Sequence, residues 1–244
     1  MNVYEKIIKK SEKGTVHMTL IDPATSGMEG SARIAREAER AGTDFILIGG
    51  STHLTIKEMD QSAQAIKEGT EIPVIIFPGS SDMFTTYADA IFFMSLLNSR
   101  DREFIMDHQV KAARIVKASG MESIPMGYLI FEPGMTVGRV GKAQLIGRTD
   151  SHLAVNYALA AELLGMKLVY MEAGSGASQP ISTEVIREVR KYISIPVIVG
   201  GGIRTPSVAR SMGQSGASII VTGTIAEQSV DVYKSLKPII DAIK

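Results

Sequence analysis

The sequence contains no cysteine and no tryptophan, and its 26 basic and 26 acidic side chains balance to a formal net charge of zero. Without cysteine there is no disulfide framework, no thiolate metal site and no cysteine nucleophile, which is typical of a reducing compartment. Without net positive charge the chain lacks the bulk field that attracts nucleic acids and acidic membranes. Any anionic ligand must therefore be bound by local features of a site.

Long apolar runs are also missing. The segment Met1–Lys13 is polar and helix-like, without the apolar centre of a signal peptide. The longest apolar stretches, such as Ala88–Leu97, are shorter than the about 20 residues that a helix needs to cross a bilayer. We therefore predict a cytoplasmic protein without a transmembrane segment, for which peripheral contact with a membrane stays open.

What the sequence does contain is a regular alternation of two patterns. Short, nearly continuous apolar runs predict strands that are buried on both faces. They are Val16–Asp22, Asp44–Gly49, Pro73–Phe77, Ala90–Ser95, Pro125–Phe131, Lys167–Glu172, Pro196–Gly200 and Ala217–Thr222. Between most of them lie segments with helical spacing: Ser31–Ala41, Ile56–Glu68, Arg102–Ser119, Ser151–Leu164, Thr183–Tyr192 and Ser207–Ser215. Eightfold alternation predicts an α/β fold in which residues 1–244 form a single (β/α)8 TIM barrel.

The third unit of this barrel is abbreviated. Only Pro78–Asp89 separates the third and fourth strands, which is near the minimum length for a parallel crossover. Either the ring of helices lacks its third member, so that the barrel wall can be reached from the side, or a short helix covers Ser81–Tyr87. The sequence leaves both alternatives open.

Three glycine-rich segments follow the last three strands, at the end of the barrel where active sites lie. They are Tyr170–Ala177, Gly200–Thr205 and Thr222–Thr224. Glycines there let backbone N–H groups converge on an anion, although one such loop alone is more often just a turn. Together the three loops predict a phosphate-binding cup, to which Ser175 and Thr224 could add hydroxyl donors.

Oxygen donors follow the first two strands. Asp22, before Pro23, and Ser51, after Gly49-Gly50, suit a hard cation such as Mg²⁺, although a turn and a helix cap explain the same residues equally well. Glu172 ends the sixth strand beside the cup, where it could accept a proton from a substrate hydroxyl or pair with a nearby basic side chain.

These motifs resemble the geranylgeranylglyceryl phosphate synthase family of archaeal ether-lipid enzymes and its bacterial prenylglyceryl phosphate synthase relatives. The resemblance spans the chain and is most specific in Tyr170-Met171-Glu172-Ala173-Gly174-Ser175-Gly176. Leu20-Ile21-Asp22-Pro23, Gly49-Gly50-Ser51, Gly200-Gly201-Gly202-Ile203-Arg204 and Gly223-Thr224 accompany it. Leu20 stands where the bacterial relatives carry a lysine, which favours the archaeal branch.

The resemblance implies a prenyltransferase of membrane phospholipid biosynthesis that acts without a redox cofactor. It would join the 3-hydroxyl of sn-glycerol 1-phosphate to geranylgeranyl diphosphate and release diphosphate. Asp22 and Ser51 would bind Mg²⁺, and Glu172 would be the catalytic base. The glycerol phosphate would be bound by Tyr170, Met171, Glu172, Ala173, Gly174, Ser175, Gly176, Gly201, Gly202, Gly223 and Thr224. Members of the family form homodimers or larger assemblies.

A prenyl tail requires a long apolar trench. We expect one wall at the abbreviated third unit, from Phe77, Met83, Phe84 and Tyr87, with Phe92, Phe93, Tyr128 and Phe131 as further candidates. Competing interpretations are another phosphate-binding barrel, such as a sugar-phosphate isomerase, an aldolase or a flavin enzyme, and a barrel that only binds its ligand. The sequence provides no cysteine and no lysine at the end of the sixth strand for the chemistry of such an isomerase or aldolase.

Overall fold

The protein was analysed as a computed structural model that describes residues 1–50 and 54–244. Eight parallel strands pair in chain order and close into a barrel, with β8 returning to β1. Their bounds are β1 Val16–Ile21, β2 Phe45–Gly49, β3 Val74–Phe77, β4 Ala90–Leu96, β5 Glu122–Ile130, β6 Leu168–Glu172, β7 Val197–Gly200 and β8 Ile219–Thr222. The predicted (β/α)8 barrel is confirmed, and each strand is buried on both faces over most of its length.

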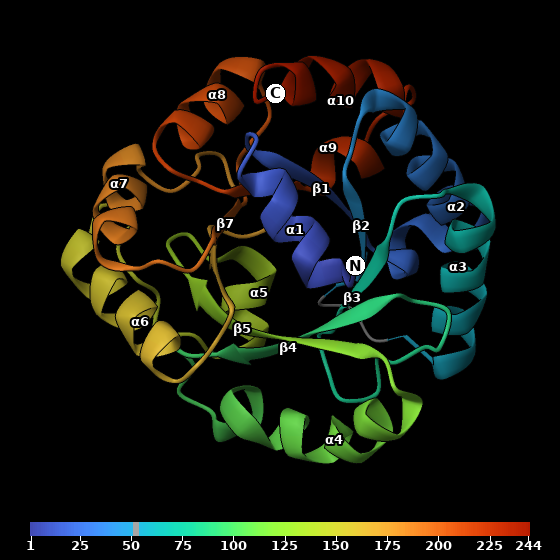
Figure 1. The fold of residues 1–244 in the computed structure, drawn as a ribbon, viewed down its shortest axis with the longest axis horizontal. Coiled ribbons are helices and arrows are strands. Elements are labelled where there is room, and N and C mark those ends of the chain that lie inside the picture. The colour runs from blue at the N-terminus through green and yellow to red at the C-terminus, as the bar shows by residue number, and fades with distance from the viewer. Residues whose placement is uncertain (51–53) are drawn as a thin grey trace.

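Helices surround this barrel (Figure 1). The longer ones are α1 Val3–Ser11, α2 Pro23–Ala41, α3 Ile56–Gly69, α4 His108–Ser119, α6 Ser151–Leu163, α7 Thr183–Tyr192, α8 Pro206–Gln214 and α10 Val232–Asp241. Side-chain caps begin several of them, for example a capping box of Thr55 and Glu58 at α3. In the part of the chain that the structure describes, no helix is long and apolar enough to cross a membrane.

Helix α1 closes the N-terminal end of the barrel, and Figure 1 shows it lying across the barrel axis. Its Val3 and Ile7 pack into the interior cluster, and the carboxylate of Glu122, at the start of β5, accepts the N–H groups of Val3 and Tyr4. Helix α1 therefore covers this end of the barrel.

The third unit contains no helix, which decides between the two alternatives left by the sequence. Residues 78–89 form turns, and a helix over Ser81–Tyr87 is absent from this described segment. β3 pairs with β4 through only two residue pairs, Ile75 with Ala90 and Ile76 with Ile91, whereas all seven residues of β4 pair with β5. The carboxyl-terminal part of β4, after Ile91, is therefore not paired with β3. We call this opening in the barrel wall the β3–β4 seam.

Three other elements differ from the sequence prediction. β5 begins at Glu122, so Pro125 lies inside the strand instead of opening it. A short helix, α5 (Met135–Val140), follows β5 and was not predicted, because six residues with one turn of apolar spacing give no helical signal. A π-helical segment, η1 (Glu103–Asp107), precedes α4, and a four-residue helix, α9 (Thr224–Glu227), precedes α10.

Candidate active site

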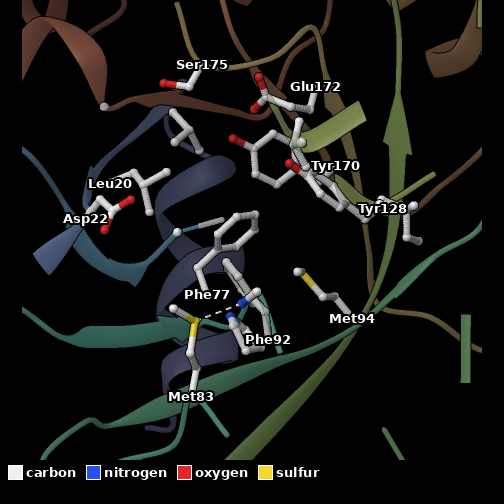
Figure 2. A pocket seen from close by; sticks show the side chains of 18 of the residues that line it. Leu20, Asp22, Phe77, Met83, Phe92, Met94, Tyr128, Tyr170, Glu172 and Ser175 are labelled. Atoms are coloured by element: carbon white, nitrogen blue, oxygen red, sulfur yellow. Dashed lines mark hydrogen bonds between the residues drawn. The ribbon is translucent and has the colours of Figure 1, made fainter. Parts of the chain in front are cut away.

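One pocket of about 260 Å³ opens at the carboxyl ends of the strands. Its lining combines polar groups from the ends of β1, β6, β7 and β8 with apolar side chains from β3, β4 and the loop between them. Figure 2 shows these two parts together, with Glu172 and Ser175 at one side and Phe77, Met83, Phe92 and Met94 at the other. A ligand with an anionic head and an apolar body fits such a pocket.

The three predicted glycine-rich loops meet at the polar side of the pocket. Four of their glycines, Gly174, Gly176, Gly201 and Gly202, have φ between 72° and 104°, a backbone conformation that other residues rarely adopt. The hydroxyl groups of Ser175 and Thr224 lie 2.8 Å apart, which joins the β6 loop to the start of α9. The loops therefore form one concave surface with two hydroxyls.

Not every residue of the predicted phosphate-binding set faces the pocket. Its lining includes Tyr170, Glu172, Ser175, Gly176, Gly201, Gly202, Gly223 and Thr224. Met171 and Ala173 are fully buried and pack between the barrel and its helices, because alternate strand residues point to opposite faces. Gly174 is also absent from the lining, and its N–H donates to the Oε1 atom of Glu172 at 2.6 Å. These three residues shape the loop that the others present.

Glu172 lies at the end of β6 with only 6% of its surface exposed. Burial raises the pKa of its carboxyl, and the hydrogen bonds from Tyr170 and from the Gly174 N–H only partly oppose that effect. Among the described residues no Lys or Arg bonds to Glu172, so the alternative in which it pairs with a basic side chain is not supported. A carboxylate with a raised pKa, positioned at a pocket, is suited to accept a proton.

A cluster of aromatic rings lies next to Glu172 inside the barrel. Tyr170 and Tyr128 contact each other edge to face with centroids 5.1 Å apart, and Phe77 lies 5.5 Å from Tyr128. Burial, then the charge of Glu172, raises the pKa of Tyr170 well above its ordinary value, so its hydroxyl stays protonated and donates to that carboxylate. Any side chain at Gly200 would overlap the Tyr170 hydroxyl and the Glu172 carboxylate, so glycine is required there.

Asp22 lies at the end of β1, across the pocket from Glu172 (Figure 2). It caps α2 by accepting the Ala24 N–H with its Oδ1 atom at 3.0 Å, so the predicted alternative of a helix cap is present. The capping contact does not exclude a second role, because the carboxylate also lines the pocket. Ser51, the other predicted Mg²⁺ ligand, lies outside the described residues.

Glu227 on α9 is a functional candidate that was not predicted from the sequence. Its carboxylate lines the pocket, and its Oε1 atom accepts the backbone N–H of Asp22 at 3.0 Å. Burial raises the pKa of Glu227, and the charge of Asp22 adds to the increase. The available signal was the spacing from Thr224, since residues three apart share one face of a helix.

The apolar side of the pocket is the trench expected at the third unit. Phe77, Met83, Phe84, Phe92, Phe93 and Tyr128 line it as predicted, together with Ile91, Met94 and Leu96. Ile91 and Phe93 belong to the outer face of β4 and Phe92 to its inner face, so the trench passes through the open seam. Tyr87 and Phe131 were wrongly assigned: Tyr87 is 43% exposed and outside the lining, and Phe131 is buried in the core.

The inner surface of η1 and α4 covers the trench with Phe104, His108, Gln109 and Ala112. α4 itself is buried at only one residue, Val116, because the trench separates it from β4. Helix α5 closes the far end with Val137 and Val140.

Charge in the pocket is mostly negative. Among the described lining residues, Asp22, Glu172 and Glu227 are acidic and Arg204 is the one Lys or Arg. Arg204 donates to the Gly176 carbonyl at 2.9 Å and so borders the glycine loops. Three other basic residues, Arg139, Lys142 and Arg148, lie outside the lining; Lys142 pairs with Asp101, and Arg148 donates to the Pro180 carbonyl.

The fold and the pocket define a (β/α)8 barrel in which glycine-rich loops form a cup at the strand ends, with a buried carboxylate beside it and an apolar trench leading from it. A model of the PcrB family matches residues 6–243, and the chain belongs to that family.

Its relatives agree. The chain is 57% identical over 244 residues to the geranylgeranylglyceryl phosphate synthase of Thermoplasma acidophilum, covering all of this chain and 96% of that protein. It is 56% identical to the enzyme of the same name from Picrophilus torridus, with both chains fully covered. The family resemblance predicted from the sequence is thereby confirmed.

Solved structures give the same result. The geranylgeranylglyceryl phosphate synthase of Thermoplasma acidophilum, in complex with its substrate sn-glycerol-1-phosphate, superimposes with a TM-score of 0.99 at 56% identity, over 100% of this chain and 99% of that chain. A thiamine phosphate pyrophosphorylase from Pyrococcus furiosus matches at a TM-score of 0.64 with 16% identity, over 99% and 97% of the two chains, a likeness that shows the fold alone.

Proposed function

We propose that this protein is a prenyltransferase that joins the 3-hydroxyl of sn-glycerol 1-phosphate to geranylgeranyl diphosphate and releases diphosphate. The observation that carries this proposal is the two-part pocket, in which a phosphate cup and a buried carboxylate open directly into an apolar trench. Relatives named for this reaction are 55–57% identical over the whole chain, which supports the same assignment.

The reaction requires orientation and one proton transfer. The hydroxyl oxygen forms a bond to the first carbon of the prenyl chain while the bond between that carbon and the diphosphate oxygen breaks. The Glu172 carboxylate takes the hydroxyl proton, and the Tyr170 hydroxyl and the Gly174 N–H hold that carboxylate in place. The loops around Ser175, Gly201 and Thr224 bind the phosphate of the acceptor and so fix the distance between its hydroxyl and Glu172.

Mg²⁺ fits the donor half of the site. Both substrates are polyanions, and the described lining carries three carboxylates against one guanidinium, so the pocket needs additional positive charge. Asp22 offers the hard oxygen that Mg²⁺ prefers, with Ser51 as the second ligand proposed from the sequence. The bound ion would neutralise charge on the departing diphosphate. No group of three His, Cys, Asp or Glu in the described chain could hold a metal, so water and diphosphate oxygens would supply the other ligands.

The prenyl tail occupies the trench through the β3–β4 seam. Its walls are apolar, and burial of each methylene of the tail contributes about 0.8 kcal/mol to binding. Met83 and Met94 add flexible walls that adapt to a hydrocarbon chain. We also place the enzyme in the cytoplasm as a homo-oligomer, with peripheral membrane contact as the route by which the apolar donor arrives.

The test is a transfer assay with radiolabelled sn-glycerol 1-phosphate and a series of prenyl diphosphates, followed by extraction into organic solvent. We expect label in the organic phase with geranylgeranyl diphosphate, loss of the product with a chelator, and recovery when Mg²⁺ is restored. Asp22→Ala should remove transfer, whereas Asp241→Ala, at an exposed position of α10, should not. Absence of product from every donor with folded, Mg²⁺-supplied protein would refute the proposal.

A further inference from the structure

Asp22 stands just beyond the hydrogen-bonded part of β1. The last residue of β1 paired with β2 is Ile21, and the last paired with β8 is Thr19. The backbone N–H of Asp22 donates instead to a side chain 205 positions away, the Glu227 carboxylate, at 3.0 Å. The direction in which the chain leaves β1, and with it the direction of the Asp22 carboxylate, therefore depends on Glu227.

Glu227 is itself fixed by a short helix that begins at the phosphate cup. α9 runs from Thr224 to Glu227, and Thr224 contacts the Ser175 hydroxyl across the cup at 2.8 Å. Three residues later, about one helical turn on, Glu227 reaches Asp22, and both Thr224 and Glu227 line the pocket. α9 thus connects the acceptor half of the site to Asp22 in the donor half.

Glu227 is partly buried, and its Oε1 atom lies within hydrogen-bond distance of the Asp22 backbone N–H. A side-chain amide at position 227 would present an oxygen to the same N–H. The contact therefore depends on an acceptor oxygen held in this place by α9, which can be tested separately from its charge.

We infer that Glu227 is a positioning residue, which orients Asp22 for the diphosphate-bound cation through the Asp22 backbone N–H and ties that orientation to the phosphate cup through α9. The inference rests on the proposed function for the identity of the cation and the donor. Residues that hold a metal ligand in place typically change metal affinity by about 10–100-fold when removed.

The experiment compares Glu227→Ala, which removes the acceptor, with Glu227→Gln, which keeps an acceptor oxygen but removes the charge. Calorimetric titration of wild type and both variants with inorganic diphosphate at a series of Mg²⁺ concentrations measures the donor half of the site without turnover. We expect Glu227→Ala to raise the half-saturating Mg²⁺ concentration about tenfold and Glu227→Gln to stay within about threefold of wild type.

Steady-state kinetics then separate positioning from general damage. Glu227→Ala should raise KM for the prenyl donor and leave KM for sn-glycerol 1-phosphate near the wild-type value, and Glu227→Gln should rescue the defect. Unchanged Mg²⁺ dependence in Glu227→Ala would overturn the inference, as would equal defects in the two variants, which would assign the effect to charge instead of position.

Failure of the proposed function can be told apart from failure of this inference. If the proposed function is wrong, wild-type protein forms no ether product, whatever the titrations show. Circular dichroism and thermal unfolding of both variants exclude a folding defect. If Glu227→Ala does not fold, Glu227→Leu, which keeps the side-chain volume, takes its place in the same comparison.

Discussion

Glu172 combines a functional position with an environment that works against its charge. Burial raises the pKa of its carboxyl, and the hydrogen bonds from the Tyr170 hydroxyl and the Gly174 N–H offset that increase only in part. The folded protein therefore holds a proton on Glu172 at pH values where the unfolded chain has released it. The contribution of this group to stability is full below the unfolded pKa and is lost as pH rises through the higher folded pKa. Ionisation of Glu172 therefore destabilises the folded protein.

Replacement of Glu172 by Gln should separate catalysis from stability. We expect kcat to fall about 10²–10⁴-fold, because the proton acceptor is lost, with KM for sn-glycerol 1-phosphate little changed. In wild type, kcat/KM should fall with acid at a higher pH than an ordinary glutamate would give. Thermal unfolding should show Glu172→Gln to be more stable than wild type above the raised pKa, and this advantage should shrink as pH falls.

Glu68→Gln, at an exposed position of α3, serves as the control for loss of one negative charge. It should keep the wild-type rate, pH profile and stability. Wild-type turnover in Glu172→Gln would contradict the assignment of Glu172 as the base.

The residues of the site could be predicted unevenly from the sequence. Tyr170, Glu172, Ser175 and Thr224 follow from their place at or just beyond the ends of late strands, and the structure places all four in the pocket lining. Glu227 shares a helix face with Thr224, but its contact with Asp22 could not be predicted, because it joins positions 205 residues apart and depends on the closure of β8 onto β1. Met171 and Ala173 were predicted to bind the ligand but are buried away from the pocket, since a motif does not say which of its side chains face the ligand.

At the scale of elements, the two glycines Gly202 and Gly176 form a matched pair. Both have positive φ, 72° and 81°, so alanine introduces similar backbone strain of about 1–2 kcal/mol at each. An added Cβ at Gly176 meets nothing within 4 Å, whereas at Gly202 it would lie 2.5 Å from the Gln179 carbonyl carbon. Gly202 therefore allows the loop after β7 to approach the loop after β6.

Gly202→Ala should raise KM for sn-glycerol 1-phosphate about tenfold or more, because the β7 loop must move away from the cup. Gly176→Ala should show the strain alone, as a loss of about 1–2 kcal/mol in unfolding free energy with a smaller change in KM. Steady-state kinetics and urea denaturation measure both quantities. Equal effects of the two substitutions on KM would contradict this account of the cup.

Helix α4 provides the corresponding test of the trench. Ala112 lines the pocket and Ala113, the next residue, is exposed. Ala112→Phe should fill the trench and lower kcat/KM for geranylgeranyl diphosphate about tenfold or more, with less effect on a ten-carbon donor. Ala113→Phe should leave both donors unaffected. The measurement is kcat/KM across the donor series, and retained use of the long donor by Ala112→Phe would place the tail elsewhere.

The elements themselves were largely predictable because their signals are periodic. Parallel strands covered on both faces appear as apolar runs, and Thr183–Tyr192 was predicted to the residue as α7. The failures lie where periodicity is short or absent. α5 has only six residues, and the start of β5 at Glu122 is polar because it contacts α1 instead of the core. The missing third helix could be suspected from loop length but not decided.

At the scale of the whole molecule, Asp44 joins distant parts of the chain below the barrel. Its carboxylate accepts from the His17 backbone N–H at 2.9 Å, from Lys10 of α1 at 2.8 Å and from Lys244. Burial alone would raise the pKa of Asp44, but the two lysines and the His17 N–H outweigh it and lower the pKa. Its stabilising effect is therefore present above the unfolded pKa and lost as pH falls through the lower folded pKa.

Asp44→Asn should lower the unfolding free energy by about 1–2 kcal/mol and the melting temperature by about 3–6 °C at neutral pH. The difference from wild type should vanish in acid. Asp241→Asn, which breaks an exposed pair with Lys237, is the matched control and should cost at most about 0.5 kcal/mol. A loss that persists unchanged to low pH would show that the charge of Asp44 is not the cause.

At the open seam between β3 and β4, the proposed substrate would fill a place that a helix fills elsewhere in the barrel. Helices lie between most successive strands of this barrel, whereas the turns of residues 78–89 leave the place outside β3 and β4 to the trench. In the proposed complex the hydrocarbon chain of the donor lies where the third helix would otherwise pack. The enzyme would then complete its own outer layer only when it is loaded, with a lipid serving in place of a peptide segment.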